Sequence, residues 1–212
     1  PTVTLSASTT SPAENAGTVS LTATQSLISS TDTTVSLSLN NTSTATNDSD
    51  YSLSGSTITI AAGSTSGTAT LTITDDSIVE SSETIIVDIS GVSGGNSQSE
   101  NGNQQVTITV SDNNDTASVT IADVSVSESA GTATVTLSLD NAVSGGFSLS
   151  FSTTNGTANS GSDYTAVSSS NVNFSGTAGE TETVSITISN DSISEGSETI
   201  TVGMSNSSSS SV

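Results

Sequence analysis

Four carboxylates gather in one short stretch of this chain. Residues 75–83 read DDSIVESSE and contain Asp75, Asp76, Glu80 and Glu83. Because the chain has no Lys, Arg or His, none of its side chains can offset the repulsion between these carboxylates. The counter-charge must come from outside, and a hard divalent cation held by oxygen ligands is the natural candidate. A flexible site with many oxygens suits Ca²⁺ better than Mg²⁺.

The acidic stretch occurs twice. Residues 190–198 read NDSISEGSE, and their three carboxylates follow those of the first stretch at a constant offset of 115 residues: Asp191, Glu195 and Glu198. A motif copied at a fixed period belongs to a repeating structural unit. The copied stretch is therefore stronger evidence for a ligand site than one acidic loop alone.

Other acidic positions recur with nearly the same period. Glu14 in AENAGT is matched by Glu128 in SESAGT, and Asp50 in DSDY is matched by Asp163 in GSDY. A further acidic run, DNND at 112–115, occurs once and separates the two copies. Seven other carboxylates are predicted to be solvated surface groups: Asp32, Asp88, Glu100, Asp123, Asp140, Glu180 and Glu182.

The elements that carry these residues are predicted to be strands. β-Branched and small polar residues alternate with a period of two, which indicates half-buried strands. The predicted strands of the first copy are 3–5, 19–23, 33–39, 57–60, 68–73, 84–90 and 106–110. Those of the second are 117–121, 132–139, 147–151, 171–174, 183–188 and 199–202. A loop is expected at 91–105, and the first copy shows no convincing helix.

About seven strands in about 110 residues are typical of an antiparallel β-sandwich. The sequence therefore predicts an all-β protein with two tandem sandwiches, at 1–113 and 114–212. The last strand of the second copy is expected to be missing from this chain, because its counterpart would fall beyond Val212. Either the chain is cut there, or another chain supplies that strand by β-augmentation.

Composition excludes several functions. A net charge of −21 without Lys or Arg excludes nucleic-acid binding and attraction to an anionic membrane. No apolar run approaches the ~20 residues of a membrane-spanning helix. Without Cys, Lys or His, the usual nucleophile–base pairs are absent, and the chain is predicted not to be an enzyme. A glycosidase-like carboxylate pair is the remaining alternative, but these carboxylates lie in polar, Ser-flanked loops that favour metal ligation.

The apolar core is expected to be thin. Hydrophobic residues make up 30% of the chain, aromatic residues 2%, and there is no Cys for a disulfide. Bound metal is then the remaining device for stabilising a small domain. A halophilic acid coat is the alternative explanation of the charge, but only 10% of residues are charged.

Taken together, the repeated motifs resemble a tandem of Calx-β domains. The resemblance rests on E-x-A-G, S-D-Y, D-D-x-I-x-E-x-x-E and the acidic run after the last strand. It implies a seven-stranded immunoglobulin-like sandwich with Ca²⁺ at one tip. The implied ligands of the first copy are Glu14, Asp50, Asp75, Asp76, the carbonyl of Ile78, Glu80, Glu83, Asp112 and Asp115. Those of the second copy are Glu128, Asp163, Asp191, Glu195 and Glu198.

The second copy departs further from the family pattern, because Asn190 replaces the first Asp and the acidic run is missing. Fewer or weaker ions are expected there. The function expected for the chain is that of a calcium-stiffened extracellular spacer repeat of a bacterial surface adhesin or filament. Its expected partners are neighbouring repeats and a surface, glycan or protein ligand. The alternatives are a calcium-sensing regulatory domain, or a glycan- or protein-binding module that acts through loops 91–105 and 140–146.

Overall fold

The computed structural model describes residues 1–96, 98–205 and 208. Two compact units are present. The first consists of Pro1–Asp76 and Glu80–Asn113, and the second of Ser77–Val79 and Asn114–Val212. Residue 97 of the predicted loop, and residues 206–207 and 209–212 of the predicted second sandwich, lie outside the described residues. Within the described part, no helix is long and apolar enough to cross a membrane.

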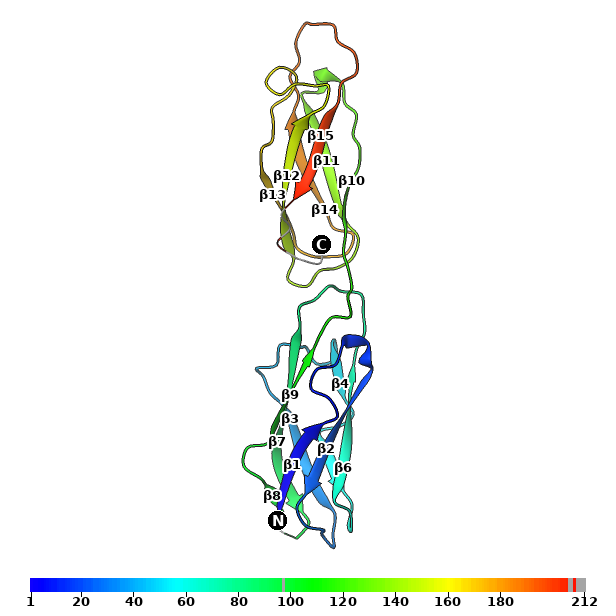
Figure 1. Cartoon of the computed structure of the whole chain (residues 1–212), viewed down its shortest axis with the longest axis vertical. Coiled ribbons are helices and arrows are strands. Elements are labelled where there is room, and N and C mark those ends of the chain that lie inside the picture. Colours follow the sequence, from blue (N-terminus) through cyan, green and yellow to red (C-terminus); the bar gives the residue numbers. More distant parts are fainter. Residues whose placement is uncertain (97, 206–207, 209–212) are drawn as a thin grey trace. The chain divides into compact units, whose positions relative to one another are not determined.

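The first unit is a sandwich of two sheets (Figure 1). One sheet has the order β4-β6-β2-β1-β8, with bounds β4 (Tyr51–Leu53), β6 (Ser66–Ile73), β2 (Thr18–Gln25), β1 (Thr2–Ala7) and β8 (Ser99–Glu100). The other has the order β5-β3-β7-β9, with bounds β5 (Thr57–Ile60), β3 (Thr33–Leu39), β7 (Glu83–Gly94) and β9 (Gln105–Val110). Neighbouring strands are antiparallel, except that β1 and β8 pair in parallel.

The core of the first unit follows from the alternation in its strands. In β2, Val19, Leu21 and Ala23 are fully buried, whereas the residues between them carry hydroxyls and face outward. Tyr51 at the start of β4 is 2% exposed and belongs to the same core. Burial of every second residue on both sheets provides the hydrophobic stabilisation of the sandwich.

Two details differ from the sequence prediction. The loop predicted at 91–105 is shorter, because β7 continues to Gly94 along β3 and β8 forms at Ser99–Glu100. Gly and Ser in this stretch hide the period-two signal, although their backbones still pair. The structure also adds two short 3₁₀ helices to the predicted strands, η1 (Glu14–Ala16) and η2 (Glu128–Ala130). Both sit at the breaks that the sequence marks with Gly.

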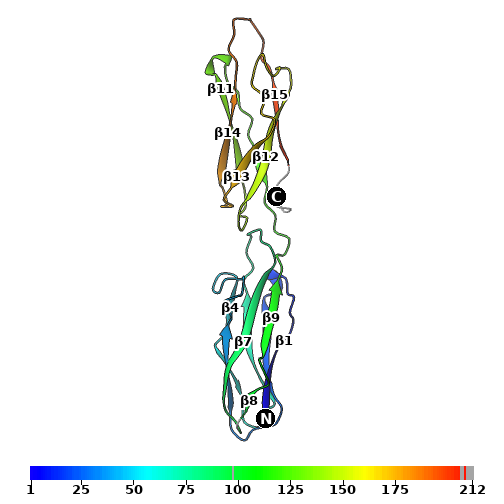
Figure 2. The same cartoon turned by 90° about the vertical axis from the view of Figure 1, so that its left-hand side faces the viewer.

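The second unit is also a sandwich of two sheets, each with three strands among the described residues (Figure 2). One sheet has the order β10-β11-β14, with bounds β10 (Val119–Ile121), β11 (Thr132–Leu139) and β14 (Thr181–Thr187). The other has the order β13-β12-β15, with bounds β13 (Ser170–Phe174), β12 (Phe147–Asn155) and β15 (Ile200–Ser205). The rings of Phe147 and Phe174 stack with centroids 5.1 Å apart. Phe151 and Tyr164 are fully buried. The predicted all-β class of antiparallel sandwiches is confirmed.

Candidate metal centre

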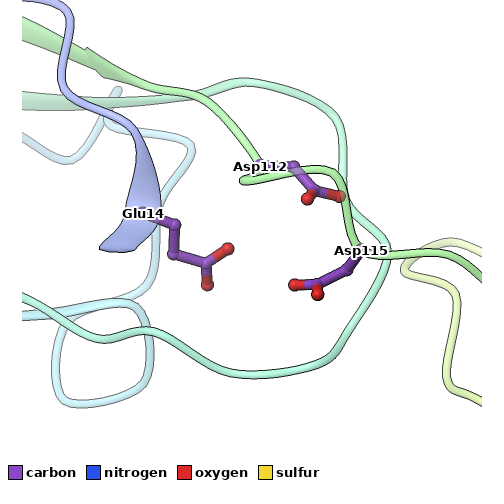
Figure 3. Close-up of side chains that lie close together, drawn as sticks. All are labelled: Glu14, Asp112 and Asp115. Atoms are coloured by element: carbon purple, nitrogen blue, oxygen red, sulfur yellow. The ribbon is translucent and has the colours of Figure 1, made fainter. Parts of the chain in front are cut away.

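One end of the first sandwich collects carboxylates from separate parts of the chain. Glu14 opens η1, which lies against the residue that follows β9, since the Glu14 amide donates to the Ser111 carbonyl at 2.9 Å. Ala13 and Ser111 form a parallel bridge there. Glu14 is 5% exposed as a result. Figure 3 shows its side chain extending from the start of η1 toward that of Asp112.

A second group of carboxylates comes from the turn before β4 and from the acidic stretch 75–83. Oxygens of Asp50, Glu80 and Glu83 lie within 4.8 Å of one another. Asp50 is held in place because its Oδ2 accepts a 2.5 Å hydrogen bond from the Thr46 amide. Glu83 is fixed as the first residue of β7. Local backbone structure therefore positions these carboxylates and brings them together.

The two groups line a single small pocket. Oxygens of Glu14 and Asp112 lie within 4.8 Å of each other, and the Glu80 amide donates a 2.9 Å hydrogen bond to Asp112 Oδ2. The pocket is lined by Glu14, Ala45, Asp50, Glu80, Ser81, Glu83, Val110 and Asp112. Its volume of about 10 Å³ is about what one water-sized particle needs. We call the five carboxylates that line it the acidic tip: Glu14, Asp50, Glu80, Glu83 and Asp112.

The electrostatics of the acidic tip show a deficit of positive charge. Burial raises the pKa of Glu14 to about 7, and the carboxylates of Asp76, Glu80 and Asp112 add to the rise. Burial likewise raises the pKa of Glu83 to about 7, and a hydrogen bond with Asp50 is the second cause of this rise. Burial also raises the pKa of Glu80. These shifts mean that the folded site resists holding all of its carboxylates ionised.

The residues present fit a hard cation. All side-chain donors of the acidic tip are carboxylate oxygens, which are the ligands that Ca²⁺ takes in proteins. Glu14 Oε2 is buried and has no hydrogen-bond partner among the described residues. A buried carboxylate oxygen without a partner is costly, and a cation would satisfy it. The five carboxylates would hold the ion, which would supply the positive charge that the chain lacks.

Four of the residues predicted for the first copy lie outside the acidic tip. Asp75 accepts a hydrogen bond from the side-chain amide of Asn113. Asp76 acts through its charge on Glu14 and Glu80. Ile78 and Asp115 are counted with the second unit; Asp115 is also labelled in Figure 3.

The second unit has a smaller and more exposed counterpart. Oxygens of Asp163, Glu195 and Glu198 lie within 4.8 Å of one another. Asp163 Oδ2 accepts a 2.7 Å hydrogen bond from the Asn159 amide, the same arrangement that holds Asp50. This bond is the first cause of the lowered pKa of Asp163. Desolvation is the first cause of the raised pKa of Glu195 and Glu198. The negative charges of the neighbouring carboxylates are the second cause.

The remaining two predicted residues of the second copy are outside this group. Glu128, in η2, acts on Glu195 and Glu198 through its charge. Asp191 accepts a 2.6 Å hydrogen bond from the Ile193 amide. The described second site thus has three converging carboxylates, compared with five at the acidic tip.

Two of the carboxylates predicted to be solvated surface groups, Asp140 and Glu180, also accept backbone hydrogen bonds. Asp140 Oδ1 accepts 2.6 Å hydrogen bonds from the Ser118 and Asn141 amides. Glu180 accepts from the amides of Ser175 and Gly176 at 2.8 and 2.9 Å. Sequence reasoning also missed Ala45, Ser81 and Val110 as pocket lining, because none of them carries a ligand signal. For the two carboxylates, the neighbouring turn residues were the available signal.

Comparison with known proteins identifies the family. The Calx-beta domain model matches residues 1–114 and again residues 111–211. The chain therefore belongs to the Calx-beta family and contains two of its domains in tandem. No curated protein sequence is similar enough to this chain to count as a match.

Solved structures similar to the chain include two CBD12 structures. CBD12 from CALX1.2 is 16% identical, with 98% of this chain and 81% of that chain covered and a TM-score of 0.46. The calcium binding domain CBD12 of CALX1.1 is also 16% identical, with 91% and 76% covered and a TM-score of 0.42. A putative carbohydrate binding protein from Bacteroides ovatus is 13% identical, with 88% and 64% covered and a TM-score of 0.40. Similarities at this level do not assign a ligand to this chain.

Proposed function

We propose that this chain is a pair of calcium-stabilised structural repeats, in which Ca²⁺ binds at the acidic tip of the first sandwich. One observation carries the proposal. Five carboxylates converge on a small pocket in a chain that has no Lys, Arg or His. Natural proteins offset such clusters with an internal cation or a bound one. Only a bound one is available here.

The energetic scale makes calcium useful to such a domain. Extracellular calcium modules bind with Kd of about 10⁻⁴–10⁻³ M. Free calcium at 100 times Kd adds about 2.7 kcal/mol to the free energy of unfolding. A small domain has a total of only about 5–15 kcal/mol. A single ion therefore supplies a substantial part of the stability of the first sandwich.

We further propose that the repeats belong to an extracellular bacterial surface protein, as spacers in an adhesin or filament. The outward faces of the sheets support this proposal. On β2 and β6, the outward residues pair Thr18 with Thr72, Ser20 with Thr70 and Thr22 with Thr68, and all of them bear hydroxyls. Together with the absence of Lys and Arg, such faces give a hydrated surface with no trypsin-type cleavage site. Both properties suit a long-lived, exposed spacer.

Isothermal titration calorimetry separates the spacer from a calcium sensor. Calcium is titrated into chelator-stripped protein at pH 7.5, with Mg²⁺ as the control ion. A spacer bathed in extracellular calcium requires only a Kd on the order of 10⁻⁴–10⁻³ M, whereas a cytosolic sensor requires about 10⁻⁷–10⁻⁵ M. Calcium binding with a Kd in the first range supports the spacer. Binding in the second range would favour the sensor, and absence of selective binding would refute both.

A further inference from the structure

The end of the first sandwich remote from the acidic tip exposes two large apolar side chains. Leu27 is 63% exposed and Ile28 is 59% exposed. They lie in residues 26–32, which join β2 to β3 and which we call the acceptor loop. The Ser26 amide donates to the Thr2 carbonyl at 2.8 Å, so the loop is at the end where β1 begins (Figure 1). Exposure alone does not indicate what covers these residues.

Hydrogen bonds hold the backbone of the acceptor loop in place. Ser29 is 1% exposed, and its carbonyl accepts a 2.9 Å hydrogen bond from the Gly63 amide. Gln98 Nε2 donates to the Leu27 carbonyl at 3.1 Å. Ser29 Oγ donates to the Thr31 carbonyl at 2.6 Å. The backbone thus presents Leu27 and Ile28 to solvent in a fixed arrangement.

The second unit has an equivalent loop, and its surface is covered. Residues 140–146 join β11 to β12 and have the same length as the acceptor loop. Val143, which occupies the position of Ser29, is 5% exposed and belongs to the same buried cluster as Val79 of the second unit. The Val79 amide donates to the Ala142 carbonyl at 3.0 Å, and the Ser144 amide donates to the Val79 carbonyl at 2.9 Å. Val79 and Val143 thereby form a parallel bridge.

The groups that make this bridge have counterparts in the acceptor loop. Ala142 and Ser144 correspond to Ile28 and Ser30. Among the described residues, neither the Ile28 carbonyl nor the Ser30 amide has a hydrogen-bond partner. The acceptor loop therefore offers the same pair of backbone groups, flanked by larger apolar side chains than in the second unit. An incoming segment can use both.

We propose that the acceptor loop binds the second acidic stretch, residues 190–198, of another copy of this chain. The matching segment of that copy is residues 190–198, which align with the acidic stretch 75–83 and which we call the donor loop. Ser194 aligns with Val79 and would supply the bridging backbone groups, whereas Ile193 aligns with Ile78 and would supply the apolar side chain. Ile193 within it is 66% exposed, more than any other large apolar residue described. Docking would place Ile193 against Leu27 and Ile28. The contact joins two different surfaces, so it is heterologous and continues head to tail rather than closing a dimer.

The contact is small, so it should be weak between free chains. Its three large apolar side chains are far fewer than the roughly 20–30 residues a side of a stable interface, so we expect a Kd on the order of 1 mM. Covalent linkage of successive repeats gives effective concentrations in the millimolar range, which is enough to populate it. The apolar contact between the two loops needs no calcium, so docking does not depend on the proposed metal site.

The test is a concentration series of the ¹⁵N-labelled full chain, from 20 μM to 1 mM, in which amide chemical shifts are measured at each concentration. Concentration-dependent shifts are expected in residues 26–32 and 190–198 and should fall at least fivefold in Ile193→Ser and in Leu27→Ser/Ile28→Ser. Val126→Ser is the matched control, because Val126 is also exposed, at 42%, and lies outside both loops. Its shifts should equal those of the parent chain.

Mixing the variants tests the head-to-tail arrangement. Labelled Ile193→Ser keeps its acceptor loop, and unlabelled Leu27→Ser/Ile28→Ser keeps its donor loop. Shifts in residues 26–32 should therefore return when the two are mixed. Absence of shifts in the parent chain up to 1 mM, or no recovery on mixing, would overturn the proposal. The thermal midpoint of each sample with and without calcium is recorded as well, so a failure of docking is distinguished from a failure of calcium binding.

Discussion

The backbone amide of Glu80 donates a 2.9 Å hydrogen bond to the Asp112 carboxylate. This bond connects the acidic stretch 75–83 to Asp112, two residues after the end of β9 in the first sandwich. It fixes the backbone of Glu80 beside the pocket that its own side chain lines. Asp112 therefore has two roles, as an acceptor that orders the loop and as a negative charge at the acidic tip.

Substitution of Asp112 separates these roles. Asp112→Ala removes both the acceptor and the charge, whereas Asp112→Asn keeps an acceptor oxygen. A hydrogen bond to a charged group contributes about 1.5–3 kcal/mol. In calcium, we expect Asp112→Ala to lower the free energy of unfolding by about that amount, and Asp112→Asn to lower it less. Urea denaturation monitored by Tyr fluorescence or circular dichroism measures both values. Equal losses for the two variants would show that the Glu80 bond contributes nothing.

Glu14 is expected to destabilise the protein without calcium and to stabilise it with calcium. Glu14→Gln removes a buried charge and leaves the shape of the side chain nearly unchanged. At pH 8 in chelator, we expect this variant to be more stable by about 1–2 kcal/mol, since an ionised buried carboxylate is costly. Its calcium affinity should fall at least about tenfold, which removes about 1.4 kcal/mol of the calcium-induced stabilisation. The measurement is denaturant unfolding with and without calcium.

Asp123→Asn is the control for Glu14→Gln, because it removes one negative charge from an exposed residue outside every carboxylate group. It should change neither the calcium affinity nor the stability by more than about 0.5 kcal/mol. If both variants behaved alike, net charge rather than the acidic tip would explain the effect.

The stability of the calcium-free protein should decrease as the pH rises from about 4.5 to 7. Glu14 and Glu83 have folded pKa values of about 7, compared with 4.5 for the free side chain. In that interval the folded state binds more protons than the unfolded state, so deprotonation favours unfolding. After allowance for solvent screening, the decrease should be on the order of 1–3 kcal/mol in all.

Calcium should reverse this pH dependence. Bound carboxylates must be ionised, so calcium affinity should increase from pH 5.5 to pH 8, and binding near pH 6 should release about one to two protons. Calorimetry in buffers of different ionisation enthalpy counts the protons released. Proton release of zero near pH 6, with affinity independent of pH, would contradict the raised pKa values.

The second carboxylate group should bind calcium more weakly than the first. It has three converging carboxylates, and Glu195 and Glu198 are exposed, whereas Glu14 is buried. We expect Glu83→Gln to remove most of the calcium-dependent rise in midpoint of the first sandwich. Glu198→Gln should remove only the weaker binding step, seen at higher calcium. A calcium titration followed by amide shifts in each unit separates the steps. Tighter binding at Glu198 than at Glu83 would contradict this ranking.

Alternating residues made the strands predictable, and the repeat made the two sandwiches predictable. The sequence also marked the chain segments that supply the acidic tip, because Glu14, Asp50 and Glu83 each recur in the second copy. It failed where backbone pairing does not depend on side-chain pattern. The extension of β7 to Gly94 is such a case, since Gly and Ser pair with β3 without a period-two signal.

The geometry of the site was less predictable than its composition. Spacing indicated Asp75 as a ligand as strongly as Glu80, but spacing does not show which of the two lines the pocket. Asp75 accepts from the side chain of Asn113, whereas Glu80 lines the pocket. The direction in which a loop residue points is decided by contacts distant in sequence, such as Glu80 with Asp112. A single sequence carries no signal for such contacts.

Thermal unfolding of the chain against free calcium, from chelator to about 10 mM, tests the central claim most directly. Mg²⁺ at the same concentrations is the control. If Ca²⁺ binds the acidic tip, the midpoint should rise by several degrees, with a half-point near 10⁻⁴–10⁻³ M and little effect of Mg²⁺. A midpoint that does not respond to calcium would mean that these carboxylates are only a solvated acidic surface. The proposed metal site would then be wrong.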